Sequence, residues 1–70
     1  MTQKIINKIL VRAEENARAG HFNITVTTKS GRQYSSWDED INTEDEDFLE
    51  IYEDDSFTYI PYSEIESLQA

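Results

Sequence analysis

The sequence has no cysteine, one proline and only two glycines in 70 residues. Without cysteine the chain can form neither a disulfide nor a thiolate metal site. With glycine only at positions 20 and 31 it has no glycine-rich loop to hold a phosphate group. No apolar run approaches the roughly 20 residues that cross a bilayer. The first residues lack the continuous apolar core of a secretory signal, so we expect a cytoplasmic protein.

A chain of this length is expected to form one domain, residues 1–70. So small a domain buries only roughly 60% of its unfolded surface and usually needs an additional stabiliser. Because disulfides are excluded, self-association is the stabiliser that the composition favours. We therefore expect a homo-oligomer.

Basic residues are missing from the second half of the chain. Residues 1–35 hold all six lysines and arginines and two acids, a net charge of +4, whereas residues 36–70 hold thirteen acids and no base, a net charge of −13. This division indicates either a solubility device or a surface for a charged partner. Nucleic acid is a poor fit to the acidic half, because phosphate contacts require lysine and arginine.

Apolar residues in the first segment recur at the spacing of one helix face, and predict a helix over about 3–19: Ile5, Ile6, Ile9, Leu10, Ala13 and Ala17. Thr2 precedes this pattern and can cap it, and Gly20 follows it. Lys4, Lys8 and Arg12 lie four residues apart and form a basic helix face.

Beyond Gly20 the apolar period becomes two, which predicts antiparallel strands over about 21–69. The expected strands are 22–28, 32–38, 48–52, 56–60 and a short one at 66–68, with turns at 29–32 and 54–55. Nine of the ten residues at 38–47 are polar, so this run is expected to be a loop. Residues 62–65 are expected to form a single helical turn.

The segment Tyr59-Ile60-Pro61-Tyr62-Ser63-Glu64-Ile65 and the spacing of Gly31, Tyr34, Asp38, Ile41 and Asn42 resemble motifs of the Sm-like small β-barrel family. The resemblance implies an α+β fold in which an N-terminal helix caps a strongly bent, five-stranded antiparallel sheet, an Sm-like or SH3-like small barrel. It also implies assembly into a ring through edge strands. Asn42 matches the asparagine that contacts RNA bases in that family, while the family's second RNA-contacting motif is absent from residues 59–65.

No catalytic group is predicted. His21 is the only histidine and lies at the end of the expected helix, and the serines have no motif context. Asp38, Asp40, Asn42 and Glu44 alternate as the oxygen ligands of a calcium loop do. Thr43 and Leu49 stand where the calcium loop requires glycine and glutamate, so we predict no metal site and no cofactor, with these four residues as weak candidates.

The sequence thus favours a non-enzymatic, Sm-like interaction module that presents an acidic surface to a protein partner with a basic surface. The predicted partner-binding residues are Trp37, Asp40, Glu44, Asp45 and Asp47. By analogy with small acidic proteins that phages use against host systems, a phage or mobile-element origin and a host-cytoplasmic location are consistent with this reading.

Two alternatives stay open. One is a small-ligand or nucleotide-binding ring, and the other is an Sm-like RNA-binding protein. A ligand or RNA site would use Asn42, Asp38 and Trp37, and RNA would also contact the basic helix face.

Overall fold

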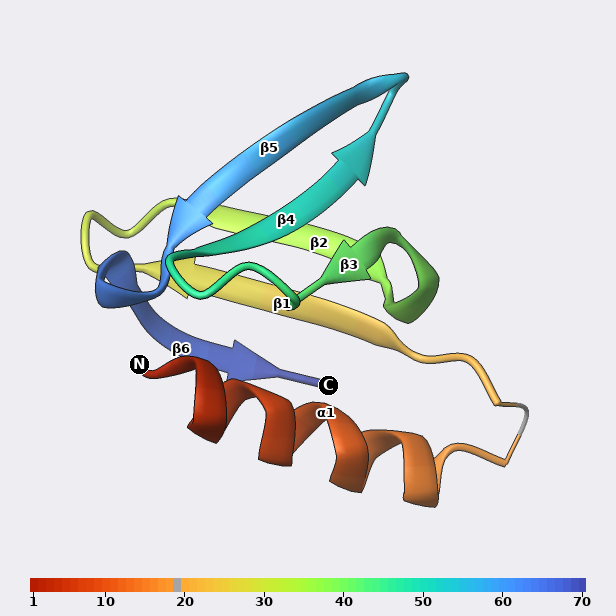
Figure 1. The fold of residues 1–70 in the computed structure, drawn as a ribbon. Coiled ribbons are helices and arrows are strands. Elements are labelled where there is room, and N and C mark those ends of the chain that lie inside the picture. The colour runs from red at the N-terminus through yellow and green to blue at the C-terminus, as the bar shows by residue number, and fades with distance from the viewer. Residues whose placement is uncertain (19) are drawn as a thin grey trace.

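The computed structural model describes residues 1–18 and 20–70, which form one N-terminal helix and six strands (Figure 1). The order of elements is α1 (Gln3–Asn16), β1 (Asn23–Thr28), β2 (Gln33–Trp37), a 3-10 turn η1 (Asp38–Asp40), β3 (Ile41–Asn42), β4 (Phe48–Glu53), β5 (Ser56–Pro61), a second 3-10 turn η2 (Tyr62–Glu64) and β6 (Ile65–Gln69). The α+β class expected from the sequence is confirmed.

Helix α1 begins where the sequence predicts. The hydroxyl of Thr2 accepts a hydrogen bond from the Ile5 amide at 3.3 Å, which satisfies one of the free N–H groups of the first turn. The helix ends at Asn16, because Ala17 adopts an extended conformation, so it is shorter than the predicted span to 19. Ala19 lies outside the described residues. Gly20 has a positive φ of 78°, but the helix has already ended at Asn16, so Gly20 does not cap it as the sequence suggested.

The first sheet has the order β2-β1-β6 and is antiparallel. Strands β1 and β2 are joined by a tight turn at 29–32 in which Gly31 has a φ of 89°, a conformation that glycine adopts without steric strain. Strand β6 pairs with the opposite side of β1. The register of this pairing shifts between Thr27 and Thr28 of β1. Helix α1 runs beside β6, on the side of the molecule away from the tip of the β4–β5 hairpin (Figure 1).

The second sheet has the order β3-β4-β5, so the strands form two three-stranded sheets in place of the single five-stranded sheet expected. The extra strand, β3, lies inside the run 38–47 that was predicted to be a loop. Ile41, the one apolar residue of that run, is half-buried against the core and pairs with Ile51. The contact of Ile41 with the core and two backbone pairings order the two residues of β3, although the composition of the run predicted a loop.

The core lies between the two sheets and the helix. It contains Ile6, Ile24, Val26, Leu49, Ile51, Ile60, Tyr62, Ile65 and Leu68, all at most 6% exposed. Ile6 is the only buried residue of α1. Every second residue of β1 and of β4 points into this core, as the period-two pattern predicted.

Candidate interaction surface

Four aromatic side chains cover the outer face of the β4–β5 hairpin. Phe48, Tyr52, Phe57 and Tyr59 are 38%, 41%, 54% and 57% exposed. Their rings contact one another in sequence, with centroid separations of 5.1 Å for Tyr52–Phe57, 6.3 Å for Phe57–Tyr59 and 6.4 Å for Phe48–Tyr59. These distances lie within the range of favourable ring pairs. The hairpin therefore presents a continuous aromatic surface to solvent, which we call the aromatic face.

Strand alternation produces this face. Leu49 and Ile51 point into the core, so Phe48, Glu50 and Tyr52 point outward from β4. In β5 the buried Ile60 likewise leaves Phe57 and Tyr59 on the outside. The turn between the strands uses Asp54 and Asp55, both with positive φ, as a two-residue hairpin turn requires.

A groove beside the aromatic face brings carboxylates together with two of its rings. It is lined chiefly by Glu39, Asp40, Asn42, Glu50, Tyr52 and Phe57. Strand register explains the grouping, because Asn42 of β3 pairs with Glu50 of β4, which in turn pairs with Tyr59 of β5. Of the residues predicted for ligand, metal or partner binding, Asp40 and Asn42 meet here.

The acidic segment 43–47 is held in place by uncharged donors. The Gln3 side-chain amide donates to the carbonyls of Thr43 at 2.7 Å and Asp45 at 3.2 Å. The buried Tyr62 hydroxyl donates to the same two carbonyls, at 3.2 and 2.8 Å. The Thr43 hydroxyl donates to the Asn7 amide oxygen. Helix α1 and turn η2 thus fix the backbone of this segment while its carboxylates remain exposed.

Two predicted site residues stabilise this segment themselves. The side-chain oxygen of Asn42 accepts from the Glu44 amide at 2.7 Å, and Asp45 accepts from the amides of Asp47 and Phe48 at 2.8 and 3.2 Å. Such bonds are the usual way in which Asn and Asp close local turns. The Asn42 oxygen is therefore occupied by its own loop, and Glu44, Asp45 and Asp47 remain exposed.

The other predicted site residues lie apart from the groove. Asp38 lines a different groove, together with Phe22, Ile24 and residues of α1. Among the residues that the structure describes, no three His, Asp or Glu side chains are grouped as they would be to hold a metal ion. Trp37 is 53% exposed at the end of β2, opposite Asn23, so it belongs to the outer face of the first sheet.

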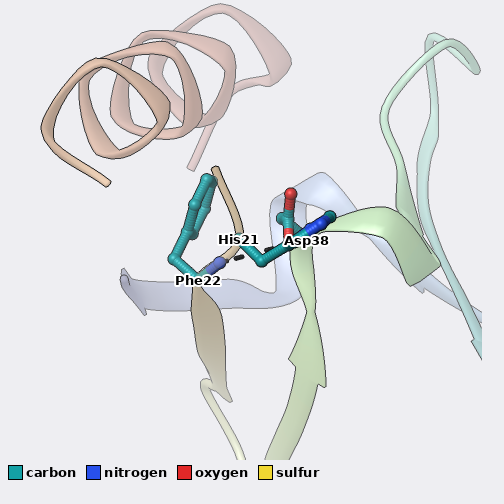
Figure 2. Close-up of polar contacts among 3 residues, drawn as sticks. All are labelled: His21, Phe22 and Asp38. Atoms are coloured by element: carbon teal, nitrogen blue, oxygen red, sulfur yellow. Dashed lines mark hydrogen bonds and ion pairs between the residues drawn. The ribbon is translucent and has the colours of Figure 1, made fainter. Parts of the chain in front are cut away.

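His21 and Asp38 form the one ion pair found within residues 1–18 and 20–70, with 3.6 Å between Nδ1 and Oδ1 (Figure 2). The same Asp38 oxygen accepts from the Phe22 amide at 3.2 Å, and the Asp38 amide donates to the Phe22 carbonyl. This arrangement closes the open end of the β1–β2 hairpin. The basic helix face, Lys4, Lys8 and Arg12, is exposed along α1.

Two tyrosines have pKa values above the ordinary 10.0. The hydrogen bond from the Tyr52 hydroxyl to Asp55, at 3.0 Å, is the main cause of the raised pKa of Tyr52, followed by burial and by the negative charge of Asp40. Burial raises the pKa of Tyr62, the charge of Asp45 adds to the rise, and a hydrogen bond with Gln3 opposes it. Both raised pKa values favour the neutral phenol, for Tyr52 mainly through its hydrogen bond with Asp55 and for Tyr62 mainly through burial.

Searches of protein-family models, of curated proteins and of solved structures found no match to this chain. None of the helices in the described part of the chain is long and apolar enough to span a membrane.

Proposed function

We propose that this protein is a non-enzymatic interaction module of Sm-like architecture, which self-associates and presents an acidic surface to a protein partner. The observation that carries the proposal is the second sheet. Its outer surface combines four exposed aromatic rings with carboxylates that have no basic neighbour in their own half of the chain. Exposed apolar patches of this kind mark interaction sites.

The chain path supports the architectural part of the proposal. The chain passes from the first sheet to the second through η1, and returns through η2. An N-terminal helix packs beside the last strand. This order of elements agrees with the helix-capped, bent sheet that the motif resemblance implies.

Two edge strands support self-association. In the described part of the chain, β5 has β4 as its only neighbour and β6 has β1 as its only neighbour. Each edge offers backbone N–H and C=O groups that another strand could pair with. Pairing of β5 of one subunit with β6 of the next would satisfy both edges and would repeat around a ring.

The acidic segment supports the choice of a protein partner. Its backbone is fixed by Gln3 and Tyr62, so binding would not have to order it. Its exposed carboxylates attract a basic protein surface and repel a phosphate backbone. A phage or mobile-element origin would fit a role of this kind, in which a small acidic protein covers a basic surface of a host protein.

The test of self-association is the native mass measured by sedimentation velocity at tens of micromolar protein, at low and at high salt. We expect an oligomer that persists or grows at high salt, because salt screens the repulsion between subunits of charge −9 and leaves strand pairing intact. A monomer at both salt concentrations would refute the ring. An oligomer that dissociates at high salt would instead indicate contacts between the basic helix face and the acidic half.

The protein-partner part of the proposal is tested by its salt dependence as well. An immobilised copy of the protein should retain basic proteins at low salt and release them as salt rises, whereas short RNA should not bind at low salt. Retention of RNA in place of basic protein would favour the Sm-like RNA-binding alternative.

A further inference from the structure

The aromatic face surrounds one carboxylate. Glu50 is half-buried on β4, with Phe48 and Tyr52 as its outward neighbours along the strand. Tyr59 is its direct partner on β5, and Phe57 lies diagonally across. On its other side Asn42 pairs with it from β3. A carboxylate is thus framed by four rings that are each between 38% and 57% exposed.

Within residues 1–18 and 20–70, no lysine, arginine or histidine lines the groove around Glu50. Residues 36–70 contain no lysine or arginine. In the part of the chain that the structure describes, the single ion pair is His21–Asp38 and the single cation–π contact is that of Arg32 with Tyr34, at 5.2 Å. Neither involves the aromatic face. Glu50 and its neighbours Glu39 and Asp40 therefore meet in one groove without a cation.

We propose that the aromatic face binds an arginine side chain from a basic segment of another protein. This inference rests on the proposed function and names the chemistry of the partner. A guanidinium group is planar, so it can stack on Tyr52, Phe57 or Tyr59 while its N–H groups donate to the Glu50 carboxylate. In the partner segment, a basic residue next to this arginine would lie near Glu39 and Asp40 at the side of the groove, and their carboxylates would compensate its charge.

Arginine fits this face better than lysine does. The ammonium group of lysine is a compact, strongly hydrated charge, whereas guanidinium is weakly hydrated and stacks on rings. The rings are too exposed to form a closed cage, so stacking area rather than enclosure would provide the affinity.

A second copy of the chain is a weaker candidate for the partner. The basic helix face contains only one arginine, Arg12, and two copies of charge −9 repel each other. The proposed subunit contact also uses the edges of β5 and β6 and leaves the outer face of the hairpin free.

The experiment uses a short peptide of alternating glycine and arginine, titrated into the ¹⁵N-labelled full chain and followed by NMR. We expect amide shifts confined to η1, β3, β4 and β5. Glu50→Gln keeps the shape of the side chain and removes its charge, and should weaken binding about tenfold. Tyr59→Leu keeps apolar area and removes a ring, and should weaken binding about threefold. The lysine version of the peptide should bind more weakly than the arginine version.

The matched control is Glu64→Gln, which removes the same charge from an exposed position of turn η2, away from both the groove lining and the acidic segment. It should change affinity by less than about twofold, as expected for a remote exposed charge. Equal losses in Glu50→Gln and Glu64→Gln would overturn the aromatic-face site and leave the acidic-surface function standing. Amide shifts of the protein that centre on residues 43–47 when the peptide is added would also overturn the aromatic-face site.

Two further outcomes separate this inference from the proposed function. If the wild-type protein binds no arginine peptide at low salt, both the site and the acidic-surface role fail, while the native mass still decides self-association on its own. If Glu50→Gln changes the native mass in place of peptide affinity, the face is a contact between copies and the inference is wrong. Thermal melting of each variant verifies that the fold is retained.

Discussion

The outer faces of the two sheets differ in chemistry although both sheets are small and antiparallel. On the first sheet, Thr25 and Ser35 are hydrogen-bonded across β1 and β2 at 3.3 Å, and Gln33 donates to the Thr27 hydroxyl at 3.3 Å. On the second sheet the corresponding positions of β4 and β5 carry aromatic rings and Glu50. Apart from the exposed Trp37 at the end of β2, the first face satisfies its polar groups internally and suits contact with water. The other exposes apolar rings beside uncompensated negative charge.

This difference shows where an interaction is favoured. A hydroxyl-rich face gains little from a partner, because its groups already have partners in the sheet and in water. Covering exposed rings removes apolar area from water, which stabilises a complex by about 25 cal/mol for each Å² buried. A partner that also brings a positive charge compensates the carboxylates. Apolar burial and charge compensation therefore both favour binding at the second sheet.

The largest expected effect separates the two faces of a single strand. Ile51→Ala removes a core side chain that is 1% exposed, and should lower the free energy of unfolding by about 2–5 kcal/mol. Tyr52→Ala, at the next residue but on the aromatic face, should lower it by less than about 1 kcal/mol. Urea denaturation measures both. Equal losses would mean that the rings belong to the core and that the aromatic face is not available for a partner.

An intermediate effect is expected at the anchor of the acidic segment. Tyr62→Phe keeps the buried ring and removes the hydroxyl that donates to the Thr43 and Asp45 carbonyls, so it should lower the free energy of unfolding by about 1 kcal/mol. The control is Tyr59→Phe, which removes an exposed hydroxyl of the aromatic face and should leave stability unchanged. If the two variants are equally stable, the Tyr62 hydroxyl adds nothing to stability and the other hydrogen bonds, from Gln3 and to Asn7, hold the segment.

Because of the Tyr62 hydroxyl, we expect the stability of the fold to depend on pH in the alkaline range. Because the pKa of Tyr62 is raised in the folded state above its ordinary 10.0, folding favours the neutral phenol. This contribution is fully present below the unfolded pKa and is lost as pH rises through the folded pKa. Wild-type stability should therefore fall more steeply above about pH 10 than that of Tyr62→Phe. Parallel declines in thermal melting curves would assign the loss to other groups, Tyr52 among them.

The smallest effect is expected on the outer face of the first sheet. Thr25→Val removes the hydroxyl that bonds Ser35 and keeps a β-branched side chain suited to a strand, so stability should change by less than about 0.5 kcal/mol. The native mass should also stay the same. A change in oligomeric state would show that this face, and not only the second sheet, takes part in assembly.

Much of the local structure followed from the sequence. The N-cap at Thr2, the positive φ of Gly31 and the turn at Asp54–Asp55 were all predicted, because each depends on the conformational preference of one or two residues. The helical turn at η2 and the position of β4 along the chain were predicted as well. The end of the helix was placed too late, since periodicity alone does not indicate where the chain must turn back.

The candidate site was predicted only in part. Asp40 and Asn42 were named, whereas Glu39, Glu50 and the rings that join them were not assigned to a site. Because residues 36–70 contain thirteen acids, the sequence does not indicate which of these carboxylates belong to a site. Trp37 was predicted to bind a partner, a ligand or RNA, and its exposure of 53% leaves the ring open to solvent. The sequence of β4 did contain the signal, because Leu49 and Ile51 on one face and Phe48 and Tyr52 on the other are more apolar surface than one core can bury.

The sequence by itself determined where the helix begins, the approximate positions of five of the six strands, and how charge is divided along the chain. These properties depend on neighbours a few positions apart. Only the tertiary structure decided that Ile41 and Asn42 form a strand, that the strands divide into two sheets, and that Asn42, Glu50 and Tyr59 lie in one cross-strand row. Pairing between distant segments sets these features, since a shift of one residue in register would turn each side chain to the opposite face.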